Sequence, residues 1–213
     1  MGTDVLFQFG ILIFALAIFY LLQHLPKRAL SKLRSKTRPS IQANRHLLAG
    51  AQFLIRARSA QNKKGTNSSN LAKSAADEAD KALAIQPREP AAHILKAMAL
   101  DIMGHKNAAL KSLDVALSPP IAKGLSEKEK GDALFKRAEL QLALNRRRRV
   151  DSAVSDLVEA VKLNGDNCKA FCLLGHCYEI KNLKDEAKSA FKKSLQIDPG
   201  LVEARQGLDR LGP

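Results

Sequence analysis

The residues best suited to chemistry gather in one short segment of the chain. All three cysteines, Cys168, Cys172 and Cys177, lie within ten residues of one another, and His176 lies among them. Cys168, Cys172 and His176 follow at intervals of four residues, so in a helix they would share one face. Thiolate and imidazole groups bind zinc, and a cysteine beside a histidine can act as a nucleophile.

Both chemistries need a further group that the sequence does not supply. Three ligands along two turns of one helix cannot surround one ion tetrahedrally without a ligand from elsewhere in the fold. A thiol nucleophile needs a third group to orient its histidine, and none is evident. The sequence also has no glycine-rich phosphate loop and no paired-carboxylate motif. We therefore expect small, reduced cysteines that fill helix seams, with no metal, no cofactor and no catalytic residue. The chain is expected to be a binding protein and not an enzyme.

The segment that holds the cysteines has a regular order of small and large side chains. This order is carried by Phe171, Leu174, Gly175, Tyr178, Ala187, Phe191 and Pro199. It resembles the tetratricopeptide repeat (TPR), in which about 34 residues form two antiparallel helices. Small residues allow the two helices to approach, large residues fill the seam between them, and a proline ends the second helix.

One such unit cannot bury its own apolar face, so further units are expected upstream. Weaker versions of the same order do occur there, and the turn inside the third is lengthened by four arginines at residues 146–149. The resemblance implies an all-α fold, a helix-turn-helix TPR solenoid. We expect one N-terminal transmembrane helix to precede it, on the separate evidence of an uncharged run at residues 5–22. The expected repeats cover residues 41–88, 90–121, 131–167 and 168–201, followed by a capping helix and terminus at 202–213.

The amino-terminal end carries an uncharged run at residues 5–22. As a helix it would span about 27 Å, close to the roughly 30 Å hydrocarbon core of a bilayer. A cleaved signal peptide is the alternative, but no Lys or Arg precedes the run and no small-residue cleavage site follows it. We therefore expect a single-pass signal-anchor helix, with residues 1–4 as a short non-cytosolic terminus.

Basic residues follow this run in what we expect to be a juxtamembrane linker at residues 23–40. Most of the net charge of +14 comes from this linker and the segment after it, because residues 5–76 contain twelve Lys or Arg and no Asp or Glu. The positive-inside rule then places the repeats in the cytosol. The sequence leaves open whether the membrane is the endoplasmic reticulum or a mitochondrial or plastid outer membrane. The expected contacts with lipid headgroups are Lys27, Arg28, Lys32, Arg34, Lys36 and Arg38. Nucleic-acid binding is not expected, because the repeat region is nearly neutral and poor in aromatic residues.

In the TPR family, the first helix of each repeat lines a concave groove that holds a peptide or a helix. Carried onto this chain, the resemblance places the groove at Leu47, Ala51, Ile94, Met98, Phe135, Glu139, Cys172 and His176. Family members that hold acidic chaperone tails use Lys, Asn and Arg at such positions. Here Leu47 and Ala51 stand where the Lys and Asn would be, and Leu95 stands where the next Asn would be. Lys136 and Lys169 are the nearest basic candidates. The alternative that these apolar residues pack against one another or against the final helix stays open.

The sequence therefore predicts a membrane-tethered protein–protein interaction module, a scaffold, adaptor or receptor that presents a TPR groove to the cytosol. The expected partner is a protein or peptide segment that is apolar or amphipathic. Two alternatives remain: a structural subunit packed permanently in a larger membrane complex, and a co-chaperone that docks chaperone tails.

Overall fold

The computed structural model describes residues 27–61 and 67–212, with side chains from residue 40 onward. The chain divides into two compact units, residues 1–42 and residues 43–213. The predicted terminus at 1–4 and the predicted span at 5–22 lie outside the described residues, as do the side chains of the six predicted headgroup contacts. Within the described ranges, no helix is both long and apolar enough to cross a bilayer.

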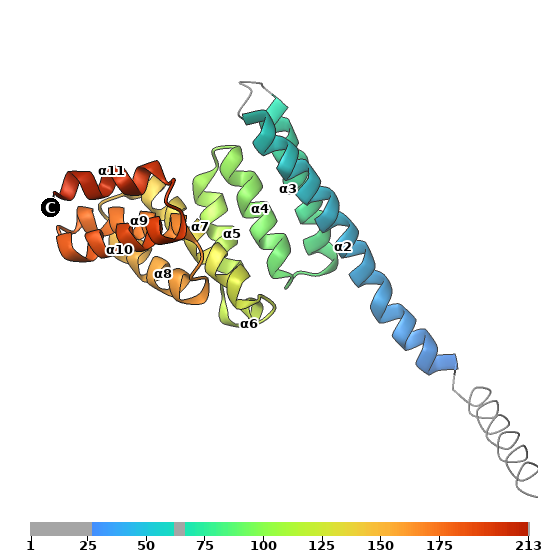
Figure 1. Cartoon of the computed structure of the whole chain (residues 1–213). Helices are drawn as coiled ribbons and strands as arrows, with labels where there is room; N and C mark the ends of the chain where they lie inside the picture. The colour runs from blue at the N-terminus through green and yellow to red at the C-terminus, as the bar shows by residue number, and fades with distance from the viewer. Residues whose placement is uncertain (1–26, 62–66, 213) are drawn as a thin grey trace, which may run out of the picture. The chain divides into compact units, whose positions relative to one another are not determined.

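The described part of the chain is helical and contains no strand (Figure 1). This agrees with the predicted all-α class. The helices are α2 (Lys27–Gln61), α3 (Asn67–Ile85), α4 (Pro90–Ile102), α5 (Lys106–Ala116), α6 (Pro119–Ala122), α7 (Glu127–Asn145), α8 (Val150–Leu163), α9 (Cys168–Ile180), α10 (Lys184–Ile197) and α11 (Val202–Leu211).

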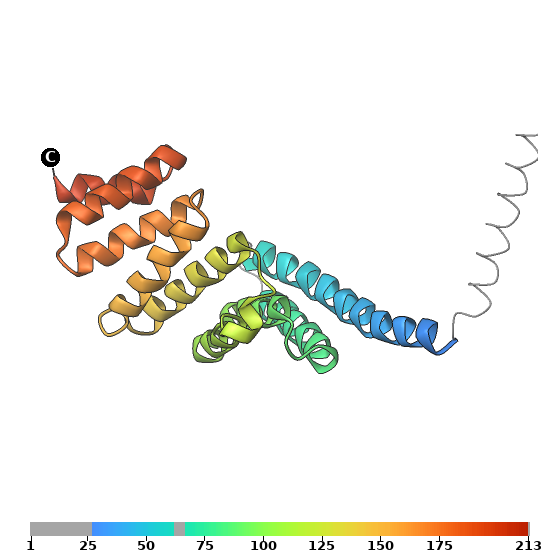
Figure 2. The same ribbon diagram turned by 90° about the horizontal axis from the view of Figure 1, so that it is seen from below.

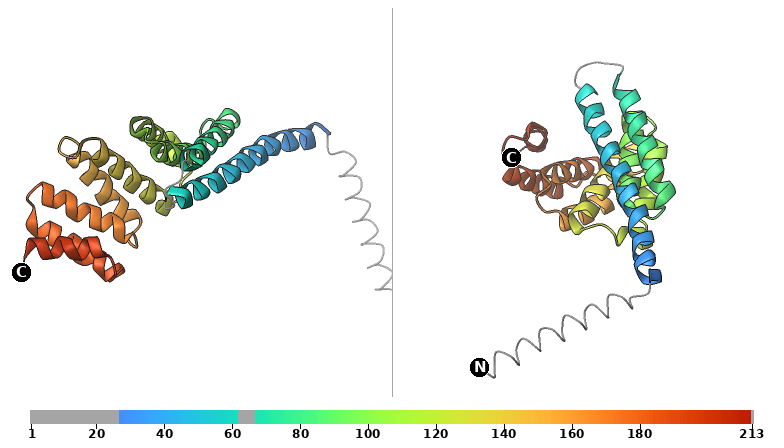
Figure 3. Two further views of the ribbon diagram at one scale, coloured as in Figure 1. Left: turned by 90° about the horizontal axis from the view of Figure 1, so that it is seen from above. Right: turned by 90° about the vertical axis from the view of Figure 1, so that its right-hand side faces the viewer.

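The helices of the second unit pack in chain order as a solenoid. Helices α4 and α5, α7 and α8, and α9 and α10 form pairs, and each pair packs against the next. Figures 2 and 3 show the last two pairs side by side, with α11 beside α9 and α10. Each helix has an apolar stripe that only its neighbours can cover, so stacking of successive pairs builds one continuous core.

Local sequence signals set where several helices begin. The Ser126 hydroxyl accepts a hydrogen bond from the Glu129 backbone N–H, and the Glu129 carboxylate accepts one from the Ser126 N–H, which is a capping box at the start of α7. The Asn167 side chain caps α9 by accepting a hydrogen bond from the Ala170 N–H. Gly104 adopts a φ of +82° in the turn between α4 and α5, a conformation that glycine adopts without steric strain.

The seam of the last repeat has the predicted composition. Ala187 and Phe191 are fully buried. A Cβ atom at Gly175 would lie 2.7 Å from the Phe191 ring, so only glycine lets α9 approach that ring. Gly207 of α11 approaches the same ring, and a Cβ atom at Gly207 would lie 2.5 Å from it. The predicted packing role of Gly175, Ala187 and Phe191 is confirmed, and the ring also fixes the position of α11.

A polar cluster ties α7 to its neighbours. The Arg137 guanidinium donates two hydrogen bonds to Asp156 of α8, at 2.8 and 2.6 Å, and a third to Asp114 of α5 at 3.3 Å. Gln141 donates to the same Asp156 carboxylate. A bidentate pair of this kind fixes geometry more than it adds stability, since both groups lose water on burial.

Three segments differ from the boundaries expected from sequence. The expected linker at 23–40 is helical from Lys27 and continues into the first repeat, because it is rich in the helix formers Ala, Leu, Lys and Arg. The short helix α6 was not expected. Pro119 and Pro120 begin it, at positions where a backbone N–H would have no partner within the helix, so the missing proline N–H is tolerated. Helix α7 begins at Glu127, four residues before the expected start at 131, because of its capping box.

Candidate partner-binding groove

The first helices of the repeats line a hollow near the amino-terminal end of the solenoid. Helices α2, α4 and α7 enclose about 290 Å³, which we call the amino-terminal hollow. Its apolar lining consists of Ala51, Leu54, Ala91, Ile94, Leu95, Met98, Leu125 and Ala133. Its charged rim is formed by Glu129, Asp132 and Lys136. An apolar floor with a few charged groups at the edge suits an apolar segment of a protein.

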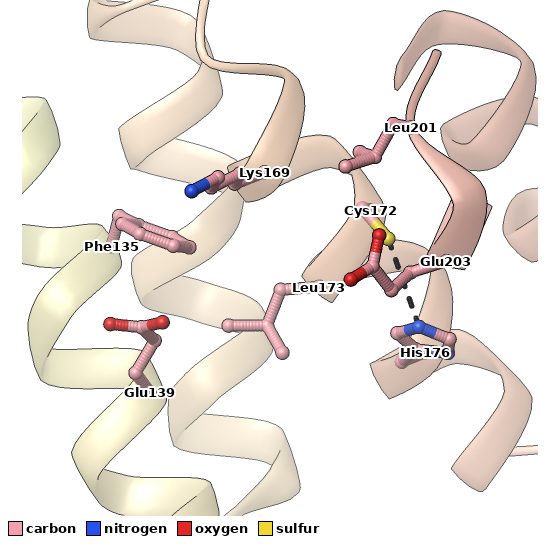
Figure 4. Close-up of a pocket in the computed structure, with 8 residues that line it drawn as sticks. All are labelled: Phe135, Glu139, Lys169, Cys172, Leu173, His176, Leu201 and Glu203. Atoms are coloured by element: carbon pink, nitrogen blue, oxygen red, sulfur yellow. Dashed lines mark hydrogen bonds between the residues drawn. The ribbon is translucent and has the colours of Figure 1, made fainter. Parts of the chain in front are cut away.

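A second hollow of about 270 Å³ lies between α7, α9 and α11 (Figure 4). We call it the carboxyl-terminal hollow. Leu173 lies in the middle of the labelled side chains, between Phe135 and Glu139 on one side and Cys172, His176 and Glu203 on the other. The full lining is Phe135, Glu139, Lys169, Cys172, Leu173, His176, Leu201 and Glu203. This hollow is more polar than the first, and α7 contributes to both.

The structure brings most of the predicted groove residues to these two hollows. Ala51, Ile94 and Met98 line the amino-terminal hollow. Leu47 does not line it and packs instead against the buried cluster of Leu54, Ala75, Ala76, Ala79, Leu95 and Ala99. The remaining four line the carboxyl-terminal hollow: Phe135, Glu139, Cys172 and His176.

The two basic candidates for a carboxylate clamp differ in their surroundings. The Lys136 ammonium lies 2.8 Å from Asp101 and 3.1 Å from Glu139. Burial opposes its charge, but these two carboxylates outweigh burial and raise the pKa of Lys136. Its positive charge is therefore already neutralised within the fold. Lys169 is exposed at the rim of the carboxyl-terminal hollow and alone provides no two-point clamp.

The cysteine and histidine of α9 form a hydrogen-bonded row. The Cys172 Sγ lies 3.7 Å from His176 Nε2, and His176 Nδ1 lies 2.9 Å from Glu179 Oε2. The Arg210 guanidinium of α11 donates to the same carboxylate at 2.9 Å. The expectation that no group orients the histidine was therefore wrong. Glu179 is three residues further along the same helix, where its side chain reaches the ring.

This row is nevertheless poorly suited to nucleophilic chemistry. Burial raises the pKa of the Cys172 thiol to about 11 and that of Cys177 to about 11 as well. A neutral thiol is a weak nucleophile and a weak metal ligand. In the part of the chain that the structure describes, no group of three or more His, Cys, Asp or Glu side chains could hold a metal ion. The His176 ring instead packs edge-on against Phe191, with ring centroids 4.9 Å apart.

We predict slow alkylation of Cys172 at neutral pH. With a pKa of about 11, roughly one thiol in 10⁴ is ionised at pH 7. Iodoacetamide labelling, read by mass spectrometry, should be much slower at Cys172 than in the urea-unfolded chain, and should accelerate with pH up to about 11. Rapid labelling of Cys172 at pH 7 in the folded protein would contradict this and would make the Cys172–His176–Glu179 row a candidate nucleophile.

Several residues of the two hollows were not expected from sequence. Leu201 and Glu203 enter from the start of α11, and Leu125 and Asp132 enter from the start of α7. The family pattern assigns the groove to the middle of each first helix, so it does not include residues at helix ends. The capping box at Ser126 and Glu129 was the one sequence signal that could have moved the expected start of α7 from residue 131 to Glu127.

Comparison with known proteins agrees with this arrangement of helices. The tetratricopeptide repeat family model matches residues 169–201. PilF of Pseudomonas aeruginosa has a similar structure, with a TM-score of 0.62, 19% identity, and coverage of 81% of this chain and 68% of PilF. YrrB, a TPR protein with an unusual peptide-binding site, has a TM-score of 0.56 at 22% identity, covering 74% of this chain and 81% of YrrB.

A third similar structure is MamA of Desulfovibrio magneticus RS-1, with a TM-score of 0.57 at 15% identity, covering 76% of this chain and 83% of that one. Among curated proteins, none matches the sequence. At these identities the similar structures establish the fold alone, while the family match establishes the last repeat. Residues 169–201 therefore match the tetratricopeptide repeat, and the described part of the chain folds as an all-α helical solenoid similar to those of tetratricopeptide-repeat proteins.

Proposed function

We propose that this protein is a membrane-tethered interaction module whose amino-terminal hollow holds an apolar or amphipathic segment of a partner protein. The observation that carries the proposal is the apolar lining of that hollow. Ile94, Leu95 and Met98 come from one helix, and Ala51 and Ala133 face them from its neighbours. The small alanines leave space that a partner's larger side chain fills.

The size of the hollow supports a small number of anchor residues. Complete burial of one Leu, Ile, Phe or Met side chain contributes about 1.5–3 kcal/mol, and the hollow has room for one or two of them. In helix-in-groove contacts of this type, the partner binds through apolar residues spaced three or four apart along its helix. The charged rim of Glu129, Asp132 and Lys136 would then fix the register of the bound segment.

The co-chaperone alternative receives less support from these contacts. A clamp for a terminal carboxylate needs cationic side chains that are free to bind it. Lys136 already contacts Asp101 and Glu139, and a ligand carboxylate would have to compete with both. A permanent structural subunit differs from a module in kinetics, since its partner would not exchange.

Site-specific crosslinking tests the proposed groove in the membrane-bound protein. A photo-crosslinking amino acid at position 98 should form an adduct with a partner protein, and the adduct should disappear when Ile94→Glu is added. The same amino acid at exposed Lys123 serves as the control. Adducts of equal yield at both positions would argue against a groove-bound partner, and an adduct that does not exchange with free partner would favour the structural subunit.

The proposed anchor is the uncharged run at residues 5–22, and the basic residues after it support a cytosolic position of the repeats by the positive-inside rule. The membrane would be the endoplasmic reticulum or an organelle outer membrane. We expect the full chain to stay in the membrane pellet in alkaline carbonate, whereas a chain starting at Ser40 should be soluble. Ala15→Arg should weaken insertion, because a charge at the centre of a span is unfavourable by about 2.5–3.5 kcal/mol on translocon scales. Release of the full chain by carbonate would contradict the anchor.

A further inference from the structure

Three turns of the solenoid lie along one edge of the repeat unit: those joining α4 to α5, α7 to α8, and α9 to α10. A hollow lined by residues 104–108 and Leu144 places the first turn beside the end of α7. An ion pair between Lys181 and Asp151, 2.5 Å long, places the third turn beside the start of α8. The order of these contacts makes the three turns one continuous surface, which we call the turn edge.

The turn edge is strongly basic. Its cationic residues are Lys106, Arg146, Arg147, Arg148, Arg149, Lys181 and Lys184. Five acidic residues flank these turns. Asp101, Asp151 and Glu179 already pair with Lys136, Lys181 and Arg210. Asp185 and Glu186 lie at the start of α10. Positive charge therefore remains in excess, and it is densest at residues 146–149.

The four arginines of the second turn make no polar side-chain contact within the described part of the fold. Arg146, Arg147 and Arg148 are exposed, and Arg149 is half-buried. Among the described residues, none of their guanidinium groups has a hydrogen-bond or ion-pair partner. The Asn145 side chain accepts a hydrogen bond from the Arg148 backbone N–H and so holds the turn in place. Four like charges in one turn repel one another, so an anionic ligand would relieve that repulsion.

We propose that the turn edge binds the anionic headgroups of a membrane surface. The guanidinium group matches phosphate oxygens in a bidentate manner and is weakly hydrated, so it releases water readily at such a surface. The charges stand at the tips of turns along an open edge, which suits an extended anionic plane better than a single peptide. Each Lys or Arg that reaches an anionic surface strengthens the attachment about fivefold. The inference rests on the proposed function for one element, the anchor that keeps the repeat unit near lipid.

Chemical footprinting of arginine in the full chain tests this proposal. The protein is reconstituted into neutral phosphatidylcholine vesicles and into vesicles with about 30% phosphatidylserine. Phenylglyoxal modification at residues 146–149 is then compared with modification of Arg88, which is exposed in the turn between α3 and α4 and serves as the internal control. We expect the modification at residues 146–149, relative to that of Arg88, to be at least about fivefold lower in anionic than in neutral vesicles. It should recover in about 0.5 M NaCl, which shortens the screening length.

Two pairs of lysine variants change the charge and leave the four arginines available for phenylglyoxal modification. Lys106→Gln with Lys184→Gln removes two flanking charges of the turn edge and should weaken the protection. Lys128→Gln with Lys162→Gln removes two exposed charges at the opposite ends of α7 and α8, and should leave the protection unchanged. Equal effects of the two pairs would mean that net charge alone, and not this edge, attracts the lipid.

The outcomes separate this inference from the proposed anchor. Flotation with neutral vesicles reports the anchor alone, because no anionic lipid is present. If the chain does not float with neutral vesicles, the anchor fails, and adding anionic vesicles to the full chain still measures protection of residues 146–149. Equal modification in anionic and neutral vesicles would overturn the proposal. Protection by polyglutamate but not by anionic vesicles would overturn it as well, and would assign the edge to an acidic protein.

Discussion

Replacing Phe191 by alanine should lower the free energy of unfolding of the repeat unit by about 3–5 kcal/mol. The ring is fully buried and is the largest of the fully buried side chains in the described part of the chain. Gly175 of α9 and Gly207 of α11 both approach it, so neither neighbour has a side chain that could fill the space left behind. Loss of the ring would therefore leave a cavity and also loosen α11.

Urea denaturation of a fragment that starts at Ser40 measures this effect. The matched control is Val202→Ala, which also truncates an apolar residue near α11, but one that is 60% exposed. Val202→Ala should change the free energy of unfolding by less than about 0.5 kcal/mol. If Phe191→Ala and Val202→Ala shift the urea midpoint equally, the ring is not the centre of the last repeat and the packing described for α9, α10 and α11 is wrong.

Met98→Glu should reduce partner binding by at least about a hundredfold. Met98 is half-buried and lies in the apolar lining of the amino-terminal hollow with Ile94 and Leu95. A carboxylate there would have to lose its water on binding an apolar segment, with no cation in the lining except Lys136, which is already paired. A hundredfold loss corresponds to about 2.8 kcal/mol, within the range expected for burying an unpaired polar group.

The control for this variant places the same carboxylate on an exposed apolar residue outside the groove. Val158 of α8 is 45% exposed and lines neither hollow, so Val158→Glu should bind the partner as the natural protein does. Arg147→Ala, in the turn between α7 and α8, should also leave the affinity nearly unchanged. Circular dichroism of each variant shows that the fold is retained. Unchanged affinity of Met98→Glu would remove the amino-terminal hollow from the binding site.

The last repeat was predictable because its pattern combines glycine, alanine and aromatic residues at fixed spacing. Gly175 and Ala187 are small where two helices meet, and Phe191 is large where their seam must be filled. The matching role of Gly207 was not predictable. Its neighbour Phe191 lies in another helix, and only the return of α11 onto the seam brings the two residues together.

The polar contacts of the site depend on tertiary geometry that sequence spacing does not carry. The spacing of His176 and Glu179 allows a contact, but Arg210 from α11 completes the cluster, and its position follows from how α11 docks. Lys136 was identified as a basic groove residue, yet its neutralisation by Asp101 requires the fold to bring a side chain of α7 within reach of the end of α4. Leu47, which the sequence placed in the groove, packs instead against the buried cluster that contains Leu54, Ala75 and Ala79, and sequence spacing alone does not show this contact.

Peptide selection on the fragment that starts at Ser40, followed by affinity measurement at low and high salt, tests the apolar groove most directly. The groove described here predicts peptides with apolar residues spaced three or four apart, bound with nearly equal affinity at about 0.05 M and 0.5 M NaCl, since apolar burial is not screened. Met98→Glu should abolish that binding. The contradicting result is selection of acidic peptides with a free carboxyl terminus, whose binding weakens with salt and is lost in Lys136→Ala or Lys169→Ala.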